Sequence, residues 1–187
     1  KRIFRTRFIT DFGSFWSEME AYLSYTQLQA LVEQEAAPEK NQEETVSYHQ
    51  NLIRLFYHIW FRDQLNSEET GFLKKFLANP SVLVAYKSFV VSAITLSLLR
   101  YFDENKFNVL FDAYGMKELT INRRAFIGLL ITLYHYDSRI PFYPGIDGRL
   151  QILSEDPAFR RDLERIIVQF IRSKETEKLQ QRIRDEI

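Results

Sequence analysis

The chain has no cysteine among its 187 residues, which excludes disulfides, thiolate metal ligands and a cysteine nucleophile. It has only three histidines, and they form neither an HExxH motif nor an i,i+4 pair that could hold zinc on a helix. Only six glycines are present, and no glycine-rich phosphate loop, GxSxG motif or paired-carboxylate motif occurs. These absences predict that the chain is not an enzyme and uses no cofactor or metal.

Charge of neither sign prevails, because 25 lysines and arginines balance 25 aspartates and glutamates. No overall field therefore attracts the chain to nucleic acid or to an anionic membrane. No uncharged stretch exceeds 12 residues, the length of 88–99 and 125–136, whereas a membrane-spanning helix needs about 20 apolar residues. We expect no membrane span and a cytoplasmic location. The chain begins with Lys1 instead of Met, which indicates a piece of a longer protein.

Apolar side chains recur at helical spacing through most of the chain. Between Phe12 and Leu23 they return every three or four residues behind Asp11, a residue type that favours the N-cap position. This pattern predicts an amphipathic helix that ends near Glu33. The stretch that follows, 36–44, is polar and acidic and contains a proline, which predicts a linker.

We therefore expect two regions: residues 1–44 as an N-terminal amphipathic helix with an acidic linker, and residues 45–187 as one helical-repeat domain. Residues 48–60 carry apolar side chains along two edges of a helix, and the segments 82–102 and 121–136 are apolar nearly all round. Helices of this kind are predicted to be covered by neighbours on more than one side.

Capping residues and prolines mark the predicted helix boundaries. Asn66 stands three positions before Glu69, the spacing of a capping box. Asn79-Pro80 and Asp156-Pro157 each pair a capping residue with a proline, which suits the first helical position because it has no N–H to leave unpaired. We expect a helix to start at each pair. The last helix is predicted to place five apolar side chains inward: Phe159, Leu163, Ile166, Ile167 and Phe170.

Long and short helical segments alternate after residue 45, and the ends of the long ones repeat. Leu99–Asp103 (LRYFD) matches Leu133–Asp137 (LYHYD) at an offset of 34 residues, and Trp60–Asp63 gives a looser match 40 residues earlier. Periods of this length are typical of helix pairs that stack in tandem, because one pair cannot bury its apolar side alone. The sequence predicts an all-α fold: a right-handed α-α superhelix, a HEAT/ARM-like stack of about three helix pairs, with an N-terminal helix and a long C-terminal helix.

Residues 122–130 (NRRAFIGLL) resemble the basic-alanine-apolar core of HEAT-type repeats. The runs VSAITLSLLRYFDENKFNVLFDAY (91–114), RRAFIGLLITLYHYDSRIPFYP (123–144) and LSEDPAFRRDLERIIVQFIRSKETEK (153–178) resemble a helical-repeat region of large Bacteroidetes proteins that also carry tetratricopeptide repeats. The resemblance implies a non-catalytic scaffold for protein–protein interaction, with a protein partner or other modules of the same parent chain. It supplies no catalytic residue.

The most unusual stretch is Tyr134–Pro144 (YHYDSRIPFYP), in which prolines stop the helix and stiffen the backbone into a predicted extended loop. Rigid aromatic and arginine side chains anchor interfaces well, because they bury much area at small entropic cost. Six residues are therefore candidates for binding a partner: Tyr134, Tyr136, Asp137, Arg139, Phe142 and Tyr143. The alternative is packing, in which the rings fill the space between helix pairs and the aspartate caps the turn.

Nucleic-acid binding along a basic groove is the alternative function. It requires seven arginines to converge on one face, and the zero net charge argues against it: Arg100, Arg123, Arg124, Arg139, Arg149, Arg160 and Arg161. At the N-terminus, basic residues alternate with apolar ones, which indicates either binding of single-stranded nucleic acid or an anionic surface, or the end of a preceding helix: Lys1, Arg2, Arg5 and Arg7. A hydrolase using His135 and Asp137 would need a cleft around the aromatic loop.

Overall fold

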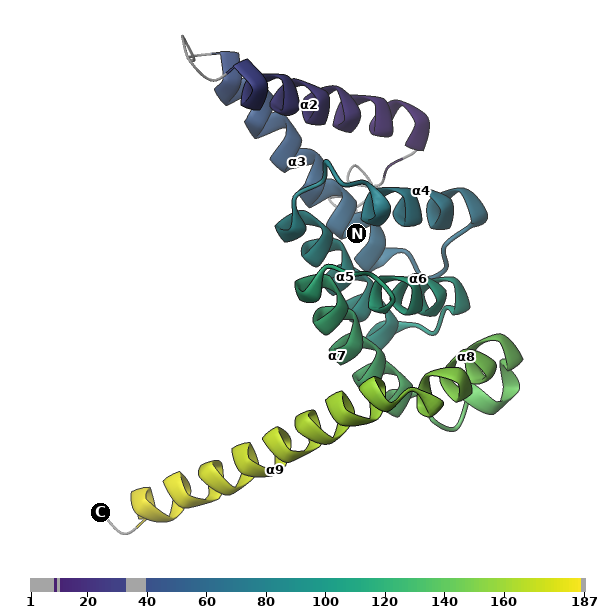
Figure 1. The fold of residues 1–187 in the computed structure, drawn as a ribbon, viewed down its shortest axis with the longest axis vertical. Helices are drawn as coiled ribbons and strands as arrows, with labels where there is room; N and C mark the ends of the chain where they lie inside the picture. The colour runs from purple at the N-terminus through teal and green to yellow at the C-terminus, as the bar shows by residue number, and fades with distance from the viewer. Residues whose placement is uncertain (1–8, 10, 33–39, 186–187) are drawn as a thin grey trace. The chain divides into compact units, whose positions relative to one another are not determined.

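The computed structural model describes residues 9, 11–32 and 40–185, and within these ranges the chain forms eight α-helices, one short 3₁₀-helix and no strand (Figure 1). The prediction of an all-α fold is confirmed. The elements are α2 (Phe12–Val32), α3 (Lys40–Phe61), α4 (Ser67–Ala78), α5 (Val84–Arg100), α6 (Glu104–Tyr114), α7 (Leu119–His135), η1 (Ile140–Phe142), α8 (Pro144–Glu155) and α9 (Pro157–Asp185).

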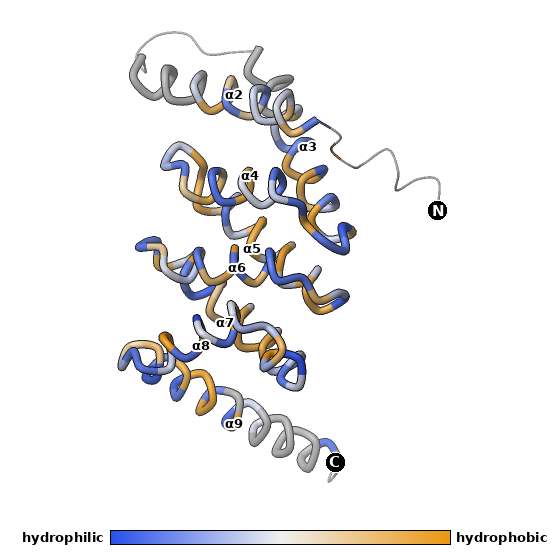
Figure 2. The backbone as a smooth tube through the Cα atoms, turned by 90° about the vertical axis from the view of Figure 1, so that its right-hand side faces the viewer, coloured by the Kyte–Doolittle hydropathy of each residue, from blue (hydrophilic) through white to orange (hydrophobic). Residues whose placement is uncertain are grey.

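The chain divides into two compact units, Lys1–Ile140 and Pro141–Ile187. In the first unit, α3 packs against α5 and α5 against α7, while α4 packs against α6 beside them (Figure 1). Figure 2 shows α4 and α6 lying next to each other. Helix α2 contacts both α3 and α4. The first unit therefore has two layers, one made of α3, α5 and α7 and the other of α2, α4 and α6.

The core of the first unit lies between these two layers. Val90, Ile94 and Leu98 of α5 and Ile121 and Leu129 of α7 are all buried. Burying a side chain of this size stabilises a fold by about 1.5–3 kcal/mol. The short helices contribute mainly phenylalanine and leucine to the same core: Phe72, Leu73, Phe76 and Leu77 of α4, and Phe107, Leu110 and Phe111 of α6.

The first helix has the predicted stripe and cap. Asp11 Oδ1 accepts hydrogen bonds from the backbone N–H groups of Gly13 (2.9 Å) and Ser14 (3.1 Å), which satisfies donors that the first turn leaves open. The buried rings of Phe12 and Phe15 meet Phe72 edge-on, with centroids 5.1 and 5.7 Å apart. The amphipathic helix is thereby joined to α4.

Two of the three predicted helix starts are confirmed. Asn66 and Glu69 form the reciprocal capping box of α4, and α9 begins at Pro157 behind Asp156, whose Oδ1 accepts from Ala158 N–H at 2.8 Å. The start at Asn79-Pro80 is wrong. Asn79 ends α4, its Oδ1 accepts from Ser81 N–H at 2.8 Å, and the resulting turn delays the next helix to Val84.

The linker prediction is wrong for its second half. Residues 36–39 lie outside the described residues, whereas 40–44 already belong to α3. These residues are lysine, asparagine, glutamine and two glutamates, and glutamates near a helix N-terminus are stabilised by the helix dipole. The domain boundary predicted after residue 44 stays a prediction.

The repeated aromatic-aspartate segments lie at helix ends, as their regular offset along the chain predicts. α3 ends at Phe61, α5 at Arg100 and α7 at His135, each just before the aspartate of its match. Asp103 goes on to cap α6, because its Oδ1 accepts from Asn105 N–H at 3.0 Å. The three matched segments therefore end three helices of one layer.

The second unit consists of α8 and α9, which pack against each other. Pro144 occupies the first turn of α8. Of the apolar side chains predicted to face inward on α9, Phe159 is buried and Leu163 and Ile166 are half-buried, but Ile167 is exposed, so that part of the prediction is wrong. The side chain of Phe170 lies outside the described residues.

α5 and α7 approach most closely where α7 has no side chain. A Cβ atom added at Gly128 would lie 2.3 Å from Thr95 Oγ1 and 3.4 Å from Thr95 Cβ. Real Cβ atoms do not approach neighbours so closely, so the present spacing of the two helices requires glycine at position 128.

We expect Gly128→Ala to lower the free energy of unfolding by about 1–3 kcal/mol, because the added methyl group overpacks the helix contact. Urea unfolding followed by circular dichroism measures the change. Gly71→Ala in α4 is the matched control, since nothing lies within 4 Å of its Cβ position, and alanine there should stabilise by up to about 1 kcal/mol. Removing Thr95 Oγ1 with Thr95→Ala should restore most of the loss. Equal stability of the two glycine variants would contradict the close approach.

Candidate functional site

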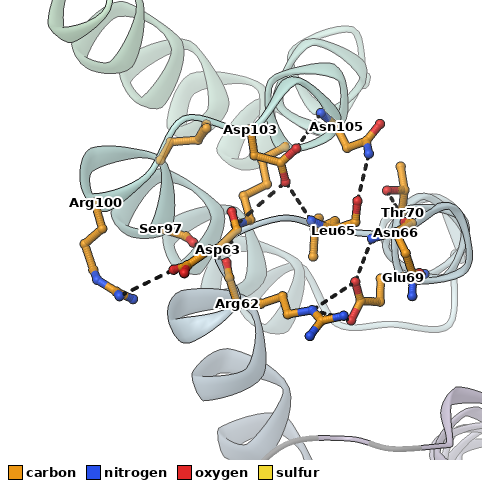
Figure 3. Close-up of polar contacts among 12 residues, drawn as sticks. Arg62, Asp63, Leu65, Asn66, Glu69, Thr70, Ser97, Arg100, Asp103 and Asn105 are labelled. Atoms are coloured by element: carbon orange, nitrogen blue, oxygen red, sulfur yellow. Dashed lines mark hydrogen bonds and ion pairs between the residues drawn. The ribbon is translucent and has the colours of Figure 1, made fainter.

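Buried charged groups gather where α3 ends and α4 and α6 begin (Figure 3). Lys106 of α6 is fully buried, and its amine donates hydrogen bonds to the backbone carbonyls of Arg62 and of Asp63, the latter at 2.9 Å. Asp103 Oδ2 accepts from Leu65 N–H at 2.9 Å and lies 3.7 Å from the Lys106 amine. The lysine therefore caps the carbonyl end of α3 from the next helix pair.

Burial lowers the pKa of Lys106 to about 8, because an ammonium group loses hydration in the core, and the carboxylate of Asp103 opposes this effect. The lysine is still mostly protonated at pH 7. Its charge is compensated by the carboxylate and by the carbonyl dipoles that it contacts.

A second buried group joins α3 to α4. Glu69 accepts hydrogen bonds from Asn66 N–H (2.7 Å) and from the side chains of Arg62 (3.0 Å) and His58 (3.0 Å). The backbone N–H of Ile9 donates to His58 Nδ1 at 3.2 Å, so the ring proton sits on Nε2 and points at the glutamate. Burial lowers the pKa of His58, against the raising effect of Glu69.

We call these two clusters, Lys106 with Asp103 and Glu69 with His58 and Arg62, the polar junction. Both clusters bind backbone groups at helix ends. Their donors and acceptors are matched to backbone carbonyls, backbone amides and one another, as buried polar groups require. Within the described ranges, no three histidine, aspartate or glutamate side chains are grouped to hold a metal ion. Only the Asn66–Glu69 part follows from a local spacing rule, because Lys106 and the carbonyls that it binds are 43 and 44 residues apart.

The long helices expose apolar side chains that the sequence analysis assigned to the core. Phe89 (38% exposed), Leu96 (40%) and Leu99 (36%) are spaced along one side of α5, and Ile127 (46%) and Ile131 (39%) along one side of α7. The prediction that both helices are covered on more than one side is confirmed, since α5 packs against α3, α6 and α7 and α7 against α5 and α6. Each buries one broad side against the second layer and leaves the opposite side open.

The same exposed side continues onto α3. Ile53 is 49% exposed, and Phe56 three residues later stacks on Phe89 of α5 with ring centroids 4.4 Å apart. The second apolar edge of this helix, predicted to be covered, is therefore open at Ile53. We call the exposed sides of these helices the α3–α5–α7 face; its apolar members are Ile53, Phe56, Phe89, Leu96, Leu99, Ile127 and Ile131.

A groove of about 590 Å³ lies on this face between α5 and α7. Most of its exposed lining is apolar, and Arg124 Nη1 donates to Ser92 Oγ across it at 2.7 Å. Ser92 Oγ donates in turn to the backbone carbonyl of Ser88 at 2.9 Å, so the arginine is held by a fixed acceptor. The lining residues are Ser92, Thr95, Leu96, Thr120, Arg123, Arg124, Ile127 and Gly128.

The helices of this face carry basic side chains. Neither α5 nor α7 contains an aspartate or glutamate, and none occurs in residues 46–61 of α3. Basic residues are present in all three helices: Arg54, Lys87, Arg100, Arg123 and Arg124. Lys87 is buried and paired with Glu118 at 2.9 Å, whereas Arg123 and Arg124 are exposed beside the groove. Two exposed arginines, Arg123 and Arg124, therefore stand beside the groove in a chain of zero net charge.

The six residues predicted to bind a partner do not share one environment. Tyr134 is 85% exposed at the end of α7, seven residues after Ile127 and thus on the same side of the helix. Tyr136 is half-buried, donates to the carbonyl of Leu98 at 2.7 Å and meets Phe102 edge-on at 5.2 Å, which is the packing role.

Asp137 and Arg139 make local contacts. Asp137 Oδ1 accepts from Ser138 N–H at 2.5 Å, and the Arg139 guanidinium lies 5.9 Å from the ring centroids of both Phe102 and Tyr136. His135 is exposed and lies edge-on to Tyr136 at 4.6 Å.

Phe142 and Tyr143 belong to the second unit. Phe142 is 80% exposed, and Tyr143 is half-buried at the N-cap position of α8. The predicted extended loop is partly wrong, since Ile140–Phe142 forms a 3₁₀ turn. The turn just before it is closed by hydrogen bonds from the backbone N–H groups of Arg139 and Ile140 to the carbonyl of Tyr136.

The seven arginines of the nucleic-acid alternative divide between the units. Arg123 and Arg124 lie together at the groove, while Arg100 donates to the carbonyl of Trp60 at 2.6 Å and lies 3.7 Å from Asp63. Arg139 contacts rings as described, and Arg149, Arg160 and Arg161 belong to the second unit. The basic N-terminal residues Lys1, Arg2, Arg5 and Arg7 lie outside the described residues.

No family model, curated protein or solved structure matches the chain. Among the helices that the structure describes, none combines the length and the apolar character needed to cross a membrane.

We expect Lys106→Met to lower the free energy of unfolding by about 2 kcal/mol, because the backbone carbonyls of Arg62 and Asp63 lose their donor and Asp103 its countercharge. Chemical denaturation provides the measurement. Lys117→Met, at an exposed position outside the helices, is the matched control and should change stability by less than about 0.5 kcal/mol. Unchanged stability of Lys106→Met would show that the polar junction does not hold the helix ends.

Acidification should destabilise the first unit through His58. The pKa of the folded ring lies below its ordinary value of 6.5, so the unfolded chain binds a proton that the folded chain does not. The free energy of unfolding therefore falls as the pH drops below about 6.5. Denaturant unfolding at pH 7 and pH 5 should show a smaller difference for His58→Gln than for the parent chain, and an equal difference would reject this assignment.

Proposed function

We propose that the chain is a non-catalytic protein-binding scaffold and that its partner docks on the α3–α5–α7 face. The observation that carries the proposal is the row of exposed apolar side chains on three successive helices of one layer. Contiguous exposed apolar surface is unfavourable in water unless something covers it, and it commonly marks an interaction site. The resemblance to helical-repeat regions of larger proteins supports the same function.

We further propose that the two layers form a right-handed α-α superhelix of the HEAT-like kind. The order of contacts supports this arrangement, because α3, α5 and α7 follow one another in one layer and α4 and α6 in the other. Such stacks present one layer as a long docking surface. In this proposal the chain is part of a longer protein, whose other modules or partners use that surface.

The groove also bears on the nucleic-acid alternative. Two arginines flank it, but its lining is mostly aliphatic and hydroxyl-bearing, with no aromatic ring on which a base could stack. Of the predicted anchors, Tyr134 is the one that extends the α3–α5–α7 face. The roles of Phe142 and Tyr143 in binding stay predictions.

Site-specific photocrosslinking tests the scaffold proposal. The chain carries a benzophenone amino acid at Leu96 or Ile131 on the face, or at the exposed Lys75 of α4 as a control, and is irradiated in extract of the producing cell. We expect discrete protein adducts from the two face positions and none from the control. Ile131→Ser with Leu96→Ser should abolish co-purification of the adduct partner at an unchanged melting temperature. Adducts from all three positions alike, or from none, would reject the proposal.

A further inference from the structure

The groove between α5 and α7 combines an apolar floor with fixed positive charge. Leu96 and Ile127 line it from the two helices, and Gly128 adds depth because it has no side chain. Its volume of about 590 Å³ lies within the range of about 300–1,000 Å³ that is usual for ligand sites. Apolar side chains of a partner would leave water on entering this groove, and because such side chains make no hydrogen bonds, none would be lost.

The positive charge beside the groove indicates which polar groups a complementary partner carries. Arg123 and Arg124 stand at the groove without an acidic residue anywhere in α5 or α7 to compensate them. Guanidinium groups bind carboxylates through paired, charge-assisted hydrogen bonds. Arg124 is already held by Ser92, so less conformational entropy is lost when it meets a carboxylate.

The backbone of the site identifies the partner's conformation. α5 and α7 use their backbone amides and carbonyls within the helices, so an extended peptide would find no ladder of donors and acceptors there. A helix satisfies its own backbone and can present apolar side chains at i, i+3, i+4 and i+7 to a groove.

From these observations we propose that the groove binds an acidic amphipathic helix of a partner protein, with its apolar side against Leu96 and Ile127 and its carboxylates on Arg123 and Arg124. This inference rests on the proposed scaffold function and names the class of partner. Phosphate backbones and anionic lipids share the negative charge but lack the row of apolar side chains that the floor requires.

Selection from a displayed library of random 18-residue peptides against the full chain tests the inference. We expect enriched peptides with an excess of aspartate and glutamate and with apolar residues at helical spacing. Their affinity, measured by fluorescence anisotropy, should fall about tenfold or more for Arg123→Glu with Arg124→Glu. Peptides whose acidic residues are replaced by lysine should bind this double variant better than they bind the parent chain.

Lys75→Glu with Lys117→Glu is the matched control, because it makes the same charge change at two exposed positions away from the groove. It should leave peptide affinity within twofold and should not bind the lysine-substituted peptides more tightly. Circular dichroism of the enriched peptides should show helix formation on binding. If the lysine-substituted peptides bind the Arg123→Glu, Arg124→Glu variant better than the parent chain, the variant is folded and contacts the peptide directly at these positions.

Three results would overturn the inference. Enriched peptides that bind the Leu96→Ser variant poorly but carry no acidic excess would reject acidic recognition while leaving the scaffold function in place. Binding of a 20-nucleotide oligouridine or of phosphatidylserine vesicles that disappears in the arginine double variant, with no peptide enriched, would assign the groove to that ligand instead. No enrichment, together with no photocrosslinked adduct at Leu96 or Ile131, would reject both proposals.

Discussion

The close contact between Gly128 of α7 and Thr95 of α5 is the feature on which the spacing of these two helices depends. Because α7 has no side chain at position 128, its backbone can approach α5 until a Cβ atom there would lie 2.3 Å from Thr95 Oγ1. On the buried side, this approach brings Ala125 and Leu129 into a closed core. On the exposed side, it brings Arg124 within hydrogen-bond distance of Ser92. One close contact thus shapes both the core and the groove.

The polar junction and the proposed docking face use different parts of the two layers. The polar junction holds the carbonyl end of α3 through Lys106 and the start of α4 through Glu69, where water is excluded and each charge has a fixed partner. The α3–α5–α7 face has no role in that network and keeps apolar and basic side chains at the surface. Variation of the face should therefore alter binding without loss of the fold.

Part of this structure could be predicted from local pattern. The capping box at Asn66 and Glu69 and the helix start at Pro157 involve residues within three positions of each other, so their geometry follows from spacing. The start at Asn79-Pro80 failed because the asparagine side chain bonds a turn instead of a helix. The groove was missed, since Ser92 and Arg124 are 32 residues apart and become neighbours only when α5 and α7 pack.

The sequence by itself determined that this protein is built of helices and where most of them begin and end, because caps and apolar spacing act within a few residues. Only the tertiary structure decided which apolar side of α5 and α7 stays in contact with water. Periodicity reports how hydrophobic each side of a helix is, but burial depends on whether a neighbouring helix covers that side. Ile127 and Leu129 are equally apolar in the sequence, and the second layer covers only Leu129.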